Sequence, residues 1–268
     1  MTHSPTELRA LLDRHGLSAR RALGQNFVVD PNTVRRIAEL SGAGPGDPVV
    51  EIGPGLGSLT LALLEVGASV TAVEMDTELV PVLRKVLEDT DVSIVEGDAQ
   101  RIDWSAVLVG HSGWRLVANL PYNVATPLIL DLLRDVPQIT EMLVMVQLEV
   151  AERLAATPPD SAIGIPSVLV AYHGVATIAA RIPPTVFHPR PRVDSALVRI
   201  VRHAEPPIAA PLAAVEPLVR AAYGQRRKMI RKSLAGLVPV DRIEAAGVDP
   251  QARPETLELA AWGRLAQA

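Results

Sequence analysis

Apolar positions along the first two thirds of the chain follow two alternating patterns. Short apolar runs, such as residues 49–52, are followed by stretches in which apolar residues recur every three or four positions, such as residues 59–66. The first pattern is typical of buried β-strands and the second of amphipathic helices. We therefore expect strands at 49–52, 69–73, 92–95, 116–118 and 142–146, and helices at 59–66, 79–87 and 126–133.

Strands that alternate with helices predict an α/β fold, in which a mostly parallel sheet has helices on both faces. Two helices should precede this region, because Ser4-Pro5-Thr6-Glu7 and Asp30-Pro31 each combine a capping side chain with a proline in the first turn. Two later apolar runs, 175–182 and 193–201, predict further strands.

The end of the chain has a different pattern. Residues 204–217 are rich in proline and alanine and lack strand character, and the residues that follow are spaced as in helices. The sequence therefore predicts two domains, an α/β domain at 1–203 and a small helical domain at 204–268.

Composition narrows the class of protein. Of the 268 residues, 48% are hydrophobic and 21% are charged, which is typical of a globular protein with a substantial core. The chain has no cysteine, so we expect no disulfide and no thiolate metal site. No other metal site is expected. No signal-peptide core or transmembrane stretch is present, which predicts a cytoplasmic protein away from membranes. Nothing in the sequence indicates more than a monomer.

A glycine-rich loop follows the first strand of the predicted sheet. The segment Glu51-Ile52-Gly53-Pro54-Gly55-Leu56-Gly57 leads directly into a predicted helix, as in nucleotide-binding α/β folds. Its spacing is G-x-G-x-G, and Ser58 stands where a dinucleotide-binding loop would have glycine. Glu74 and Asp98 end the next two strands, where they could accept from ribose hydroxyls and from an adenine amine. The three strand ends together predict a nucleoside cofactor.

The fourth strand ends in Asn119-Leu120-Pro121-Tyr122-Asn123. This segment brings together a neutral amide acceptor, a backbone carbonyl and a flat aromatic face. That combination suits an exocyclic amine on a flat ring, such as N6 of adenine. Beside a nucleoside-cofactor loop, it predicts methyl transfer to a base.

Net charge is −4, which by itself does not favour a nucleic-acid partner. The distribution of charge along the chain does favour such a partner, because residues 220–232 contain six basic residues and no acidic one. A basic stretch of this kind is compatible with RNA binding, although many such stretches are only solvated helix faces. The basic residues are Arg220, Arg226, Arg227, Lys228, Arg231 and Lys232.

Taken together, these motifs resemble S-adenosyl-L-methionine-dependent methyltransferases, and among them the ribosomal RNA adenine N6,N6-dimethyltransferase family. The resemblance covers almost the whole chain and is nearest to the members that act on the small ribosomal subunit. Besides the glycine loop and Asn119 to Asn123, it rests on Leu23 to Phe27, Val73 to Asp76, Gly97 to Ala99, Phe187 to Ser195 and Gln225 to Lys228.

The resemblance implies a Rossmann-like methyltransferase fold and assigns roles to residues at matching positions. S-adenosyl-L-methionine would be held by Gln25, Asn26, the backbone at Val28, Gly53, Gly55, Glu74, Asp98 and Asn119. The catalytic residues would be Asn119, Leu120, Pro121 and Tyr122, and RNA would contact Tyr122, Phe187, Arg226, Arg227, Lys228 and Arg231.

The chemistry of the motif suggests how these residues would act. The side-chain oxygen of Asn119 and the carbonyl of Leu120 or Pro121 would accept the two N–H bonds of the adenine amine and orient its lone pair. Tyr122 would stack on one face of the ring and Phe187 on the other, each contact contributing about 1–3 kcal/mol.

The implied function is dimethylation of two adjacent adenosines near the 3′ end of 16S rRNA, together with a role in small-subunit assembly. Three alternatives remain open at this point. The chain could be a large-subunit (23S) rRNA adenine methyltransferase of the macrolide-resistance type, or a mainly non-catalytic assembly factor. A dehydrogenase could also use a glycine loop, and binding of S-adenosylmethionine against NAD would separate that alternative.

Overall fold

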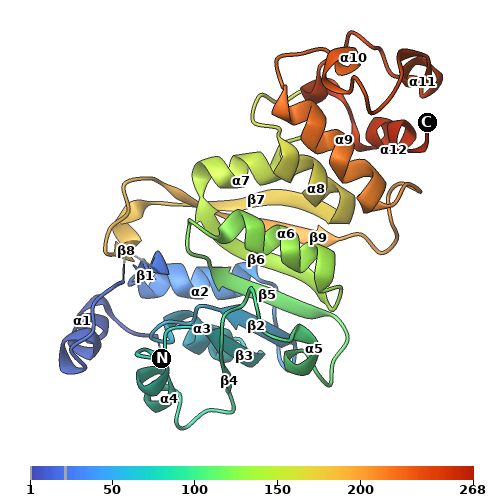
Figure 1. The fold of residues 1–268 in the computed structure, drawn as a ribbon. Coiled ribbons are helices and arrows are strands. Elements are labelled where there is room, and N and C mark those ends of the chain that lie inside the picture. The colour runs from blue at the N-terminus through green and yellow to red at the C-terminus, as the bar shows by residue number, and fades with distance from the viewer. Residues whose placement is uncertain (1, 21–22) are drawn as a thin grey trace. The chain divides into compact units, whose positions relative to one another are not determined.

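The computed structural model describes residues 2–20 and 23–268. Its main element is a seven-stranded sheet in the order β4-β3-β2-β5-β6-β9-β7 (Figure 1). The pairs from β4 to β6 are all parallel, as predicted. The strands are β2 (Pro48–Ile52), β3 (Ser69–Glu74), β4 (Ser93–Glu96), β5 (Trp114–Asn119), β6 (Ile139–Gln147), β7 (Gly174–Ile182) and β9 (Ser195–Arg202).

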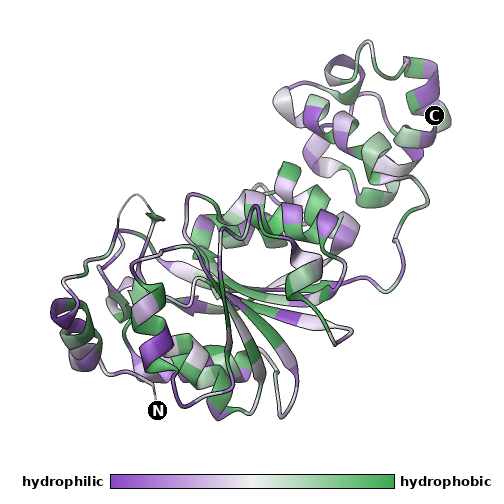
Figure 2. Cartoon of the chain, turned by 60° about the horizontal axis from the view of Figure 1, so that its bottom comes forward, coloured by the Kyte–Doolittle hydropathy of each residue, from purple (hydrophilic) through white to green (hydrophobic). Residues whose placement is uncertain are grey.

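The central strands are buried on both sides, which explains why they read as continuous apolar runs. In β5, Leu116, Val117 and Ala118 are all at most 1% exposed. Val117 packs with residues of α2 (Pro31–Leu40) and α3 (Ser58–Glu65). Because successive side chains point to opposite faces, its two neighbours face the other layer, where α6 (Ala125–Asp135) packs against β6. Figure 2 shows these strands as mostly hydrophobic. The α/β prediction is confirmed.

Both N-terminal helices begin where their caps predict. Ser4 caps α1 (Pro5–Arg14), accepting from the Glu7 amide while the Glu7 carboxylate accepts from the Ser4 amide. Asp30 caps α2 and accepts from the Thr33 amide at 2.8 Å. Such caps stabilise a helix by about 1 kcal/mol each. The inner face of α1, with Leu8 and Leu12, packs on Leu56 in the loop after β2 and on Leu79, which follows β3.

Several elements differ from the predictions. Two helices that the sequence did not indicate, α7 (Leu148–Ala155) and α8 (Ile165–His173), follow β6. Helix α6 begins at Ala125, one residue earlier than its Thr126-Pro127 signal suggests, and has no side-chain cap. Other elements around the sheet are α4 (Val80–Val86), α5 (Trp104–Val107), and the short antiparallel pair β1 (Phe27–Val28) and β8 (Phe187–His188).

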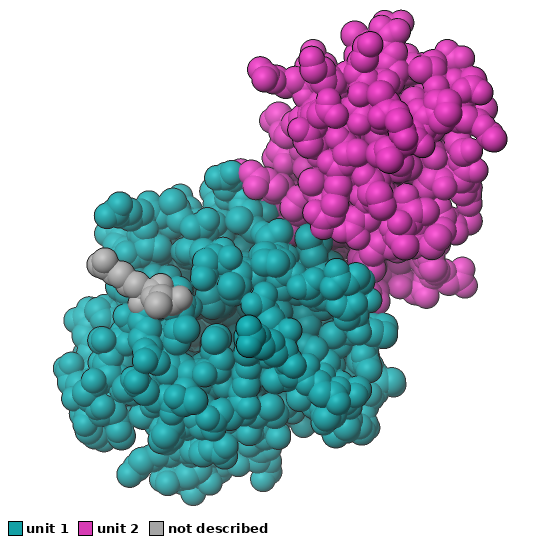
Figure 3. Space-filling view, viewed as in Figure 1, with its two compact units in different colours: residues 1–151, 177–200 teal, residues 152–176, 201–268 magenta. Residues whose placement is uncertain are grey.

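The chain divides into two compact units, but not where the sequence placed the boundary (Figure 3). Unit 1 comprises 1–151 and 177–200, and unit 2 comprises 152–176 and 201–268. The predicted boundary after residue 203 lies close to the third crossing, between residues 200 and 201, whereas residues 152–176, which the sequence placed in the first domain, group with unit 2. They join unit 2 because α8 contributes Val168 to its core.

Unit 2 is helical and contains α8, α9 (Leu212–Gly224), α10 (Ile230–Ser233), α11 (Val240–Ala245) and α12 (Leu259–Gln267). Helix α8 packs against α9 and α12, and α10 packs against α9. Its core surrounds Trp262, which is fully buried. Pro217, predicted to lie in a linker, is inside the first turns of α9. No helix in the described part of the chain is long and apolar enough to cross a membrane.

Candidate functional site

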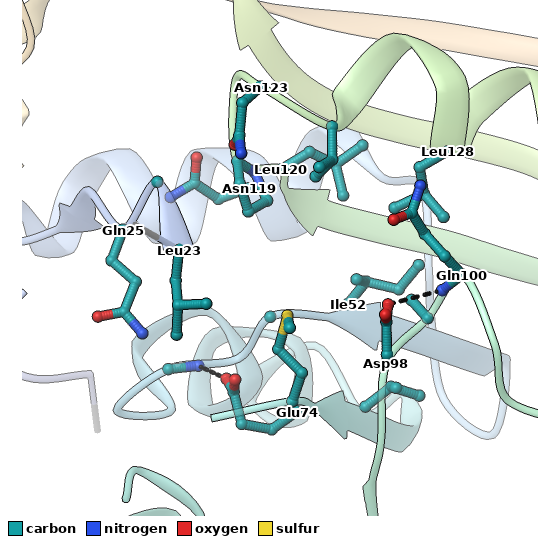
Figure 4. Close-up of a pocket in the computed structure, with 18 of the residues that line it drawn as sticks. Leu23, Gln25, Ile52, Glu74, Asp98, Gln100, Asn119, Leu120, Asn123 and Leu128 are labelled. Carbon is teal, nitrogen blue, oxygen red and sulfur yellow. Dashed lines mark hydrogen bonds between the residues drawn. The ribbon is translucent and has the colours of Figure 1, made fainter. Parts of the chain in front are cut away.

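A cavity opens at the carboxyl ends of β2, β3, β4 and β5 (Figure 4). Parallel strands end at one edge of a sheet, so residues far apart in sequence meet there. The cavity brings together ten of the predicted site residues, namely Gln25, Asn26, Gly53, Gly55, Glu74, Asp98, Asn119, Leu120, Pro121 and Tyr122.

The glycine loop needs its glycines for conformation and for space. Gly53, Gly55 and Gly57 have φ values of 69°, 58° and 82°, in the left-handed region that other residues rarely adopt. A Cβ atom on Gly55 would lie 2.9 Å from the ring of Phe27, which also lines the cavity. The bare backbone therefore forms the cavity floor under an aromatic ring.

Glu74 is 4% exposed and holds the loop in place. Its Oε2 accepts from the Gly55 amide at 3.0 Å, and its Oε1 accepts from the Asp76 amide at 2.9 Å. Burial raises the pKa of this carboxyl, and the two backbone donors act in the opposite direction. Each oxygen keeps acceptor capacity toward the cavity, so the group can hold two neighbouring hydroxyls of a ribose.

Asp98 lies at the end of β4, on the side of the cavity away from Asn119 (Figure 4). It accepts from the Gln100 amide at 2.9 Å, and Arg101 lies 3.6 Å away. Its carboxylate stays partly exposed, so it can also accept from an amine in the cavity.

The side chain of Asn119 has a defined orientation. Its Nδ2 donates to the backbone carbonyl of Asn26 at 2.8 Å. Because a carbonyl oxygen can only accept, this contact identifies which end of the amide is nitrogen. Among the described residues no donor reaches Oδ1, which is therefore available as an acceptor at the cavity wall.

The backbone after Asn119 distinguishes two carbonyls that the sequence left open. The Pro121 carbonyl accepts from Val124 at 3.2 Å and from Ala125 at 3.1 Å, which starts α6. No described residue donates to the Leu120 carbonyl. Leu120 is therefore the better second acceptor for an amine, because Pro121 is already engaged in the helix.

The ring of Tyr122 lines the cavity, and its hydroxyl points to Ser195. The two oxygens are 2.7 Å apart. Burial raises the pKa of Tyr122, so the phenol stays neutral at physiological pH and presents an uncharged aromatic face.

Gln25 acts mainly through its neighbours. Its side-chain oxygen accepts from the Arg20 amide at 2.9 Å, and its nitrogen donates to Asp76 at 2.7 Å. Asp76 is 2% exposed and also accepts from the Arg20 guanidinium at 3.0 Å. The hydrogen bonds of Gln25 thus connect the segment before β1 to Asp76, just after β3.

Sequence reasoning missed several cavity-lining residues. Phe27, Met75, Gln100 and Asn123 all contribute to the wall, and each stands within two positions of a residue that had been assigned a role. Their contribution depends on how each backbone turns after its strand, which the motifs alone do not specify.

Two residues that were expected at the site do not line this cavity. Val28 and Phe187 pair across β1 and β8 and are 7% and 4% exposed. Both pack in the core with Ile182 and Leu197. The ring of Phe187 therefore packs among core side chains and does not line the cavity, and its stacking on a target base stays a prediction.

The predicted RNA-contacting cations belong to unit 2, around the start of α10. Arg227, Lys228 and Arg231 are exposed. Arg226 is half-buried and donates to the Ser161 carbonyl at 2.8 Å. Arg226 therefore has a structural contact in addition to any contact with RNA.

Glu51 is a buried carboxyl group in β2, directly before the glycine loop. It is 1% exposed, its Oε2 accepts from the Thr60 hydroxyl at 2.6 Å, and it borders a smaller cavity with Ser58 and Asn119. Burial raises the pKa of Glu51 to about 8, with the nearby Glu74 acting in the same direction.

Comparison with known proteins adds the family. The model for "Ribosomal RNA adenine dimethylase" matches residues 16–268. The ribosomal RNA small subunit methyltransferase A of Nocardia farcinica is 47% identical over 278 residues, covering 98% of this chain and 94% of that protein. The protein of the same name from Thermobifida fusca is 45% identical over 275 residues, covering 98% and 95%.

Solved structures show the same architecture. The 23S rRNA methyltransferase ErmE is 29% identical with a TM-score of 0.72, covering 90% of this chain and 98% of that one. A dimethyladenosine transferase from Plasmodium falciparum, 22% identical, has a TM-score of 0.74 over 88% and 94% of the chains, a likeness of fold. The family match spans both units, and the cavity carries the motif residues on a Rossmann-like sheet. This chain belongs to the ribosomal RNA adenine dimethylase family and is a methyltransferase.

Proposed function

We propose that this protein transfers methyl groups from S-adenosylmethionine to the N6 amines of two adjacent adenosines near the 3′ end of 16S rRNA, in the cytoplasm and as part of small-subunit assembly. The observation that carries the proposal is the orientation of Asn119, whose Oδ1 is left as an acceptor at the tip of β5. A neutral acceptor of this kind suits an amine that must keep its lone pair free.

The cavity fits the proposed cofactor. Glu74 offers two buried carboxylate oxygens for the ribose hydroxyls, and Asp98 offers an acceptor for the adenine amine. The bare backbone at Gly55 leaves room that a Cβ would fill. When bound, S-adenosylmethionine supplies an electrophilic methyl group on its sulfonium.

The chain's own residues orient the target. Asn119 Oδ1 and the Leu120 carbonyl accept the two N–H bonds of the amine, which directs its lone pair away from both acceptors. Tyr122 stacks on the base, and this contact offsets the cost of taking the base out of the RNA, a few kcal/mol. Orientation of this kind can contribute roughly 7–11 kcal/mol to a displacement reaction.

The relatives favour the small subunit over the large one. Proteins named as small subunit methyltransferases are 43% to 47% identical to this chain over nearly its full length. The 23S rRNA methyltransferase ErmE is 29% identical.

The proposal can be tested with purified subunits. Small subunits that lack N6,N6-dimethyladenosine should gain two such residues, detected by mass spectrometry of the 16S rRNA. Large subunits in parallel should gain none. Methylation of only the large subunit would support the 23S alternative, and tight binding to immature small subunits without methyl transfer would support the assembly-factor alternative.

The exposed cations of unit 2 carry a separate prediction. Replacing Arg227 and Lys228 with glutamate should weaken RNA binding and reduce the slope of log K against log salt by about 0.7 per lost phosphate contact. The measurement is RNA affinity at several salt concentrations. Arg242→Glu, a single reversal on exposed α11, is the control and should leave the slope near that of the wild type. An unchanged slope in the double variant would make this stretch a solvated face.

A further inference from the structure

The segment Phe187 to Ser195 is one of the motifs that carry the family resemblance, yet the ring of Phe187 is buried and does not line the cavity. The two ends of this segment nevertheless contact both walls of the site. At its start, Phe187 pairs with Val28 and His188 pairs with Phe27. The amide of Val29 also donates to the Val186 carbonyl at 2.8 Å. This pairing supports the wall that contains Asn26.

At its other end the segment contacts the wall that contains Tyr122. Ser195 is fully buried as the first residue of β9, and its Oγ lies 2.7 Å from the Tyr122 hydroxyl. The preceding residue is also held, since the Asp194 carbonyl accepts from the Leu148 amide at 2.9 Å. Backbone contacts therefore determine where the Ser195 hydroxyl lies.

We propose that Ser195 is a positioning residue for methyl transfer, which acts by orienting the ring of Tyr122 through its hydroxyl. A tyrosine side chain in a half-open cavity can rotate about two bonds, and a hydrogen bond at its far end restricts both rotations. The ring then presents one fixed face to the target base. This inference rests on the proposed function, in which Tyr122 stacks on that base.

The physical consequence concerns the geometry of the reacting amine. A base that stacks on a tilted ring would shift its amine relative to Asn119 Oδ1 and the Leu120 carbonyl. Reaction rates depend steeply on such shifts, whereas the cofactor contacts of Glu74 and Asp98 lie at the ends of β3 and β4, away from Tyr122 in the chain. Loss of the Ser195 hydroxyl should therefore lower kcat and leave cofactor affinity intact.

The test is a double-mutant cycle with Ser195→Ala and Tyr122→Phe. Each single variant should lower kcat about tenfold, as expected for one lost hydrogen bond that acts on orientation, with cofactor Kd within about twofold of the wild type. The double variant should be no slower than either single variant, because both remove the same contact. Wild-type kcat in Ser195→Ala, or losses that multiply in the double variant, would overturn the inference.

A control variant and a spectroscopic measurement distinguish the proposed positioning role of Ser195 from a merely structural role. Ser41 is 2% exposed, and its hydroxyl donates to the Ala38 carbonyl and accepts from the Ala43 amide. Ser41→Ala should lower Tm without changing kcat. The chain has three tyrosines, so NMR of ring-labelled tyrosine gives a simple spectrum in which Tyr122→Phe identifies one signal.

In Ser195→Ala only the Tyr122 signal should move, and an unmoved signal would overturn the inference whatever the activity. This readout needs no methyl transfer. If the wild-type protein failed to methylate either subunit, the proposed function would fall, while the NMR result would still decide whether Ser195 orients Tyr122.

Discussion

Replacing Asn119 with alanine is expected to lower the rate of methyl transfer by about a hundred- to a thousandfold, the usual effect of removing one preorganised polar group at a reacting centre. The loss follows from the absence of the Oδ1 acceptor, since Nδ2 is already bonded to the Asn26 carbonyl. Cofactor affinity should stay within a few-fold, because Glu74 and Asp98 remain. Single-turnover methylation and calorimetric titration measure the two quantities.

Two further variants sharpen this result. Asn119→Asp keeps an acceptor but loses the donor to the Asn26 carbonyl, so it should also be strongly impaired. Asn32→Ala removes an exposed amide of α2 that does not line the cavity, and should retain activity within a few-fold. Full activity of Asn119→Ala would contradict the proposed mechanism, and so would an equal loss in Asn32→Ala.

The free energy of unfolding is expected to fall as the pH rises, because of Glu51. Its pKa is raised from 4.5 to about 8 in the folded protein, so between these values the folded chain keeps a proton that the unfolded chain loses. Each pH unit in this window then lowers the free energy of unfolding by up to about 1.4 kcal/mol. Below the window both states are protonated, and above it neither is, so the contribution is constant at each end.

Glu51→Gln removes this titration and keeps an oxygen that can accept from Thr60. The loss of unfolding free energy between pH 6 and pH 8 should therefore be smaller in the variant, by roughly 2 kcal/mol. Denaturant unfolding at the two pH values measures it. Glu39→Gln removes the same charge from an exposed position and should behave as the wild type. Equal pH dependence of Glu51→Gln and the wild type would contradict the assignment.

Much of this fold could be predicted because its strands are short, apolar and separated by polar loops. The ends of β2, β3, β4 and β5 were recognisable for the same reason, and the parallel sheet brought Gly53, Glu74, Asp98 and Asn119 to one cavity. These positions follow from topology alone.

What could not be predicted depends on contacts between segments far apart in sequence. The segment 152–176 has the apolar content of any buried helix, and only the partners of Val168 show that it belongs with unit 2. The burial of Phe187 could not be predicted, because an aromatic residue in a motif has the same sequence signature whether it faces a ligand or the core. The choice between the Leu120 and Pro121 carbonyls required knowing where α6 begins.

The contact between Asn119 and Asn26 has a consequence for how this catalyst tolerates change. One amide group joins the tip of a central strand to a segment that itself depends on Gln25, Arg20 and Asp76. Damage to that outer segment would rotate the reactive amide without touching the sheet. Substitutions near the N-terminus can thus abolish methyl transfer while the sheet and its helices stay folded.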